Sequence, residues 1–108
     1  MGGWKMINKL VRDKIPEIIK SSGKNPIYES IKDEERYIKL LKLKLQEEVT
    51  EYIESNQTVE LCDVVEVVYA LLKIQGISQT QFENMRNEKA SSNGKFEDKV
   101  FLKDIESV

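Results

Sequence analysis

Apolar residues recur at intervals of three and four positions through two long stretches of the chain, residues 33–55 and 58–75. This spacing gathers apolar side chains on one face of a helix, so it predicts two amphipathic helices. The connection between them, residues 56–58, is short, and we therefore expect the helices to lie side by side and antiparallel. The apolar stripe of the first helix consists of Tyr37, Leu41, Leu45 and Tyr52, with Ile38 and Val49 beside it.

Two shorter helices are predicted on either side of this pair. The first covers about residues 14–22, where Pro16 fits the first turn of a helix. The second covers about residues 78–92, because the hydroxyl of Ser78 can accept a hydrogen bond from the backbone of the first turn. Gly76 precedes it and predicts the end of the preceding helix.

The two ends of the chain are predicted to be extended. Residues 99–105 alternate between apolar and polar side chains, as a short strand does, and we expect them to pair with residues 7–11. Together these elements predict an all-α fold with a four-helix-bundle core and short N- and C-terminal extended segments. No repeat or linker divides the chain, so one domain over residues 1–108 is expected.

The third predicted helix is apolar on nearly all sides. Between residues 61 and 74 only Asp63, Glu66 and Lys73 interrupt the apolar sequence. A helix of this kind is buried in a core or in a subunit interface. Because a small four-helix chain has little surface with which to cover it, the sequence predicts a homodimer or homotetramer.

The composition excludes several kinds of chemistry. The chain has no histidine, which removes imidazole bases, imidazole metal ligands and Cys/His zinc sites. Its one cysteine, Cys62, lies in the apolar run and is expected to be a small core residue. A net charge of −2 gives no general attraction to a nucleic acid polymer or to a membrane. With no signal peptide or transmembrane stretch in the sequence, a cytoplasmic protein is expected.

Two pairs of acidic residues interrupt the apolar faces of the long helices. Glu48 and Glu51 are three positions apart on one helix, and Glu60 and Asp63 repeat that spacing on the next. Residues three apart are neighbours on a helix surface, so each pair can converge on one point. Buried carboxylates raise one another's pKa and are costly to bury, and a hard cation offsets both penalties. Oxygen ligands favour Mg²⁺, with Mn²⁺ as a substitute.

Another interpretation of these acids stays open on spacing alone. Acidic residues are common in this chain, and pairs three apart arise by chance on solvated helix faces. Glu47 fits either interpretation. The remaining acids of the helical regions are expected to be solvated, namely Glu29, Glu34, Glu35, Glu54, Glu66, Glu83 and Glu88.

The order of the carboxylates resembles a known signature. It reads Glu47-Glu48-x-x-Glu51 followed by Glu60-x-x-Asp63, and it is similar to the EExxE…ExxD pattern of the all-α nucleoside triphosphate pyrophosphohydrolases, which include MazG proteins, dimeric dUTPases and phosphoribosyl-ATP pyrophosphohydrolases. Residues 8–16 and 89–96 resemble a MazG-like branch of that superfamily, so the likeness extends over nearly the whole chain.

The resemblance implies a reaction and a role for each residue. In that superfamily four carboxylates bind Mg²⁺ and water attacks a nucleoside triphosphate, giving a monophosphate and pyrophosphate. Here the metal ligands would be Glu48, Glu51, Glu60 and Asp63, with Glu48 and Glu47 at the catalytic centre and Glu47 as an accessory acid or a base that positions water. The basic residues implied to bind substrate phosphates are Lys9, Arg12, Lys14, Arg86 and Lys89.

Two other functions are compatible with the sequence. A helical module that binds nucleotides or oligomerises without catalysis is supported by Asn93, which stands where much of the family has arginine. A di-iron carboxylate bundle is disfavoured because no Glu-x-x-His motif is present. The resemblance itself favours an enzyme acting on a canonical or damaged nucleotide, and a role in the removal of non-canonical nucleotides would be consistent with it.

Overall fold

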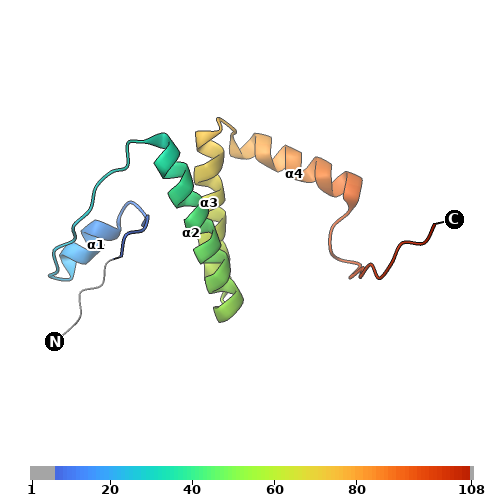
Figure 1. The fold of residues 1–108 in the computed structure, drawn as a ribbon, viewed down its shortest axis with the longest axis horizontal. Coiled ribbons are helices and arrows are strands. Elements are labelled where there is room, and N and C mark those ends of the chain that lie inside the picture. The colour runs from blue at the N-terminus through green and yellow to red at the C-terminus, as the bar shows by residue number, and fades with distance from the viewer. Residues whose placement is uncertain (1–6, 108) are drawn as a thin grey trace.

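The computed structural model describes residues 7–107 and contains helices joined by coil (Figure 1). The helices are α1 (Ile15–Ser21), α2 (Glu34–Ser55), α3 (Thr58–Ile74) and α4 (Gln79–Asn93). Each lies within a residue or two of its predicted range, and the all-α class is confirmed for this part of the chain. None of these helices combines the length and the apolar character needed to cross a membrane.

Helices α2 and α3 form an antiparallel hairpin, which is the packed part of the molecule (Figure 1). The Asp33 side chain accepts a hydrogen bond from the backbone N–H of Glu35 and begins α2. Asn56 ends that helix in the left-handed conformation, with φ 58°, which asparagine tolerates well. Gln57 alone then separates Asn56 from α3, so the short predicted connection holds the two helices together.

The core between these helices is small. Leu41 on α2 and Val67 and Leu72 on α3 are the buried apolar residues of the described chain, with 5%, 7% and 7% of their surface exposed. Glu48 is buried beside them to the same degree, at 5%. The hairpin is therefore held by few side chains, and one of them carries a charge.

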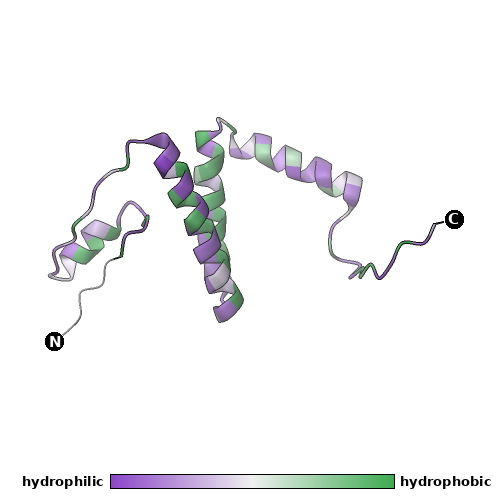
Figure 2. Cartoon of the chain, viewed as in Figure 1, coloured by the Kyte–Doolittle hydropathy of each residue, from purple (hydrophilic) through white to green (hydrophobic). Residues whose placement is uncertain are grey.

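Helix α4 leaves the hairpin instead of packing along it (Figure 1). Gly76, with φ 72°, ends the turn after α3, and a capping box between Ser78 and Gln81 starts α4 in a new direction. The new helix is mostly polar (Figure 2), so it has little apolar surface with which to dock. The predicted four-helix bundle is therefore not formed by residues 7–107 of a single chain.

The expected pairing of the chain ends is wrong for the described residues. Residues 7–11 and 99–105 are coil, and they lie on opposite sides of the hairpin (Figure 1). Asn8 and Lys99 adopt positive φ angles of 45° and 56°, which interrupt an extended run. Because α4 carries residues 99–105 away from residues 7–11, neither of these described segments has the other within reach as a partner strand.

One side of α3 is open to solvent. Leu61 and Val65, which are 41% and 44% exposed, lie on the side of α3 that α2 does not cover, and Val59 in the first turn of α3 is 63% exposed. Cys62 is exposed as well, which corrects the expectation that it is a core residue. Leu61, the apolar residue next to Cys62 in the sequence, is exposed as well.

The dimensions of the molecule agree with this open arrangement. Its radius of gyration is 19.1 Å, whereas a compact chain of about 100 residues has a value of about 13 Å. It exposes 10223 Å² of surface, whereas a compact monomer of this mass exposes about 6,200 Å². A single chain thus leaves about 4,000 Å² uncovered that a compact fold would bury.

Candidate metal centre

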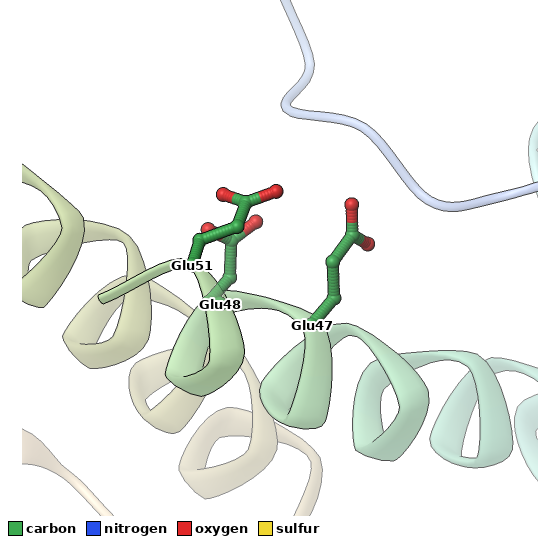
Figure 3. A group of neighbouring side chains, drawn as sticks. All are labelled: Glu47, Glu48 and Glu51. Atoms are coloured by element: carbon green, nitrogen blue, oxygen red, sulfur yellow. The ribbon is translucent and has the colours of Figure 1, made fainter. Parts of the chain in front are cut away.

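The α2–α3 hairpin brings the acidic residues of both helices to one place. One carboxylate oxygen from each of Glu48, Glu60 and Asp63 lies within 4.8 Å of the others, and Glu47, Glu48 and Glu51 form a second group that meets the same limit. Figure 3 shows the three carboxylates of α2 on the same side of the helix, with those of Glu48 and Glu51 next to each other. Glu48 belongs to both groups and therefore joins the two helices' acids into one cluster.

Glu48 is the buried member of this cluster. Its Oε1 lies 3.0 Å from Nζ of Lys44, while its Oε2 is buried and accepts no hydrogen bond from the described part of the chain. A buried carboxylate oxygen without a donor loses its hydration and receives nothing in return, which costs several kcal/mol for a charged group. A cation at this point would satisfy it.

Lys44 is a residue of this centre that the sequence reading did not single out. Its Nζ lies 3.0 Å from Glu48 and 3.4 Å from Glu47, and its side chain is 17% exposed. Burial lowers the pKa of Lys44, but the neighbouring carboxylates of Glu48 and Glu47 outweigh it and raise the pKa overall. Its spacing in the sequence could have identified it, because Lys44 is three and four positions before Glu47 and Glu48, and residues at these distances are neighbours on a helix.

The N-terminal segment supplies two further cations. Lys9 Nζ lies 2.7 Å from Glu47 Oε1, and Arg12 Nη2 lies 2.5 Å from Asp63 Oδ1. The hydrogen bond from Lys9 lowers the pKa of Glu47, with Lys44 adding to the effect. Lys9 and Arg12 thus reach the carboxylates of two helices that lie far from them in the sequence.

Glu51 and Glu60 have no such counter-ion among residues 7–107. The pKa of Glu51 is raised, first because its protonated form can share a hydrogen bond with the adjacent carboxyl of Glu48, and then by the charge of Glu48. The pKa of Glu60 is raised by desolvation first, and then by the hydrogen bond and charge of Asp63. These two acids therefore carry the uncompensated repulsion of the cluster.

The charges of the cluster leave room for a divalent ion. Five carboxylates converge, and three cations of the described chain pair with them, which are Lys9, Arg12 and Lys44. With all five acids ionised the formal difference is at least two negative charges, since Arg12 is shared with Glu66 at 3.9 Å, and one Mg²⁺ or Mn²⁺ would neutralise two of them. All ligand atoms are oxygens, the type that both ions prefer.

The other basic residues implied by the resemblance do not reach this centre within one chain. Lys14 precedes α1 and is exposed. Arg86 pairs with Glu83 on the surface of α4, and Lys89 is exposed on the same helix. Since α4 starts at the far end of α3 and runs outward (Figure 1), it holds both residues away from the carboxylates.

The acids expected to be solvated are confirmed as exposed. This holds for Glu29, Glu34, Glu35, Glu54, Glu66, Glu83 and Glu88. The acids that belong to the cluster are thus distinguished from the solvated ones by their place in the hairpin.

Comparison with known proteins adds little about function. No family model and no solved structure matches the chain. An uncharacterised protein of Mycolicibacterium smegmatis is 49% identical over 43 residues, which cover 40% of this chain and 43% of that protein. The chain thus matches less than half of that relative's length, and the match assigns no activity.

The repulsion within the cluster predicts a pH effect on the metal-free protein. Because the pKa of Glu51 is raised on folding, its stability contribution is present below the ordinary glutamate pKa of 4.5 and is lost as the pH rises through the folded value. Replacing Glu51 by Gln should therefore raise the melting temperature at pH 7, and the gain should shrink towards pH 4. Thermal denaturation in EDTA measures both effects.

The matched control for this prediction is Glu54→Gln, which changes an exposed residue of the same helix. It should leave the melting temperature close to that of the wild type at both pH values. An equal gain in the two variants would show that a general reduction of negative charge is responsible, and would contradict the local repulsion.

Proposed function

We propose that this protein is a Mg²⁺-dependent nucleoside triphosphate pyrophosphohydrolase, which converts an NTP or dNTP to the monophosphate and pyrophosphate. The observation that carries the proposal is the buried, unpartnered oxygen of Glu48 in a cluster of carboxylates from two helices. The MazG-like order of these residues, described above, supports the choice of reaction. A role in removing non-canonical nucleotides in the cytoplasm fits the same chemistry.

Glu48, Glu51, Glu60 and Asp63 would hold the metal. Their oxygens suit Mg²⁺, and Mn²⁺ would replace it. When bound, such an ion neutralises charge that develops on phosphoryl oxygens and promotes ionisation of a water molecule. Glu48 fits this role best among the four, because its burial leaves a cation as the available partner for Oε2.

Glu47 would act on water instead of on the metal. Both of its oxygens are paired with lysines, Oε1 with Lys9 and Oε2 with Lys44. These cations lower the pKa of Glu47 and keep it ionised at neutral pH, so it is suited to accept a hydrogen bond from water and poorly suited to donate a proton. We therefore favour a water-positioning base over an accessory acid.

The reaction needs one bond formed and one broken. The oxygen of water bonds to the α- or β-phosphorus atom and gives up one proton, which passes by way of Glu47 to solvent, while the P–O bond of the α,β-phosphoanhydride breaks and its electron pair leaves on the oxygen of the departing phosphate product. Lys9 and Arg12 lie close enough to the carboxylates to hold phosphate oxygens beside them. Lys14, Arg86 and Lys89 would contribute only if another copy or a movement of the chain brings them near.

A second candidate is a helical module that binds nucleotides or oligomerises without catalysis. One observation favours it, namely the separation of Arg86 and Lys89 from the carboxylate cluster. A module of this kind would bind a nucleotide and Mg²⁺ but would release no pyrophosphate.

A panel of nucleoside triphosphates tests the proposed activity. With Mg²⁺ or Mn²⁺, at least one NTP or dNTP should yield pyrophosphate in an enzyme-coupled assay. Glu48→Gln and Asp63→Asn should each lower kcat/KM by at least about 100-fold, because loss of even an outer-shell partner typically has effects of 10–100-fold. Glu54→Gln, on the exposed side of α2, should retain the activity.

The assay separates the two candidates. Nucleotide binding without pyrophosphate release from any substrate of the panel would support the non-catalytic module. Activity that survives both Glu48→Gln and Asp63→Asn would place the catalytic centre elsewhere and contradict the proposal.

We further propose that the protein works as a homo-oligomer, a dimer or a tetramer. The uncovered area of about 4,000 Å² per chain exceeds the roughly 800 Å² that each partner buries in a standard interface. The exposed apolar residues of α3 offer a surface of the right character (Figure 2). A second copy could complete on this surface the bundle that one chain leaves open.

If the protein is an oligomer, its mass in solution should exceed that of one chain, and a charge placed in the interface should lower that mass. Light scattering coupled to gel filtration should give a multiple of the 12.5 kDa chain mass. Val65→Glu, on the open side of α3, should shift the protein towards the monomer, because a charge would have to be buried in the interface. Thr50→Glu, at an exposed position of α2, introduces the same charge away from α3; it is the control and should leave the mass unchanged. A monomeric wild-type protein would contradict this proposal.

A further inference from the structure

The N-terminal segment is fastened to the α2–α3 hairpin through the carboxylates themselves. Lys9 pairs with Glu47 and Arg12 pairs with Asp63. Between them Leu10 is half-buried, beside Leu40 and Leu43 of α2. The helix that follows, α1, packs against none of the other helices in the described chain. The attachment of residues 9–12, here named the basic strap, thus depends largely on the ion pairs of Lys9 with Glu47 and of Arg12 with Asp63, to which a longer contact of 3.9 Å between Arg12 Nη1 and Glu66 Oε1 on the solvated side of α3 is added.

A bound metal would compete with the basic strap for the same carboxylates. Asp63 is both the partner of Arg12 and a member of the oxygen group that it forms with Glu48 and Glu60. A divalent cation at that group would stand close to the Arg12 guanidinium, and like charges repel strongly at such distances. Glu47 is not among the four proposed metal ligands, although it forms the second group with Glu48 and Glu51, so the pair between Lys9 and Glu47 meets a weaker conflict than the pair between Arg12 and Asp63.

We propose that the basic strap is an internal counter-ion that a divalent cation displaces at one end. In the metal-free protein Arg12 neutralises Asp63. Metal binding releases Arg12, while Lys9 keeps the strap attached at Glu47. The freed guanidinium then remains tethered beside the metal and can hold an anion there, which for the proposed reaction is the polyphosphate of the substrate. The metal half of this inference stands without the proposed function, and the anion half rests on it.

Arginine side-chain NMR tests the displacement directly. The chain has three arginines, and the other two provide internal controls, because Arg36 pairs with Glu29 and Arg86 with Glu83 away from the cluster. On titration with Mg²⁺, the Nε–Hε resonance of Arg12 should shift and exchange faster with water. The resonances of Arg36 and Arg86 should stay in place.

Metal affinity gives a second readout that needs no nucleotide. Arg12→Gln should bind Mn²⁺ about two- to five-fold more tightly in an EPR titration, the fold-change that corresponds to removing one partly exposed ion pair. Lys14→Gln removes the same charge two residues away, from a side chain that is exposed and forms no ion pair with the described residues. Lys14→Gln should change the affinity for Mn²⁺ by less than half of the change that Arg12→Gln causes.

The outcomes separate the strap from the proposed function. A shift of the Arg12 resonance without hydrolysis of any nucleotide would support displacement and contradict the enzyme. Hydrolysis with an unmoved Arg12 resonance, or equal affinities for Arg12→Gln and Lys14→Gln, would overturn the strap and leave the enzyme intact. Failure of Mg²⁺ and Mn²⁺ to bind would overturn both.

Discussion

Glu48 lies in the interface that holds α2 and α3 together, where its carboxylate takes the place of an apolar side chain. Lys44 neutralises one of its oxygens, and the other has no donor in the described chain. In the part of the chain that the structure describes, the core has three buried apolar residues, and a core this small leaves little margin of stability for the burial of a charged group. Glu48 thus has two opposite effects at one position. Its charge weakens the packing of α2 against α3, and the same carboxylate is the one best placed to hold a cation. The acids of both helices, the lysine one turn earlier and the N-terminal cations are all arranged around it.

Much of the helical hairpin could be predicted from the sequence because its causes are local. The periodicity of apolar residues, Asp33 before α2 and the short connection at Gln57 are properties of neighbouring residues, and the carboxylates followed from their spacing along those helices. The direction of α4 could not be predicted, because a capping box starts a helix without specifying what it packs against. The exposure of Cys62 could not be predicted for a similar reason. An apolar helix indicates that its surface needs to be buried, but it does not indicate whether the same chain or a second copy buries it. Lys44 was missed because a lysine among many surface lysines gives no signal until its carboxylate partners are placed.

The open arrangement and the charged centre are connected by the distribution of apolar surface. Apolar residues of α3 remain uncovered, while α4 is too polar to cover them and α1 packs against no other helix among residues 7–107. The basic strap is therefore held near the centre by charge more than by packing, and it can respond to a change of charge there. A second copy that docks on the open side of α3 must not cover residues 9–12, because the carboxylates are approached from the side where the basic strap lies. This requirement limits where an oligomer interface can lie.

The central claim is that the carboxylate cluster holds a divalent cation, and metal-dependent stability tests it most directly. A ligand present at 100 times its Kd adds about 2.7 kcal/mol to the free energy of unfolding, so millimolar Mg²⁺ should raise the melting temperature of the wild-type protein. Glu48→Gln should abolish this rise, whereas Glu54→Gln, on the exposed side of α2, should preserve it. A melting temperature of the wild type that does not respond to Mg²⁺ or Mn²⁺, or a rise that persists in Glu48→Gln, would contradict the account.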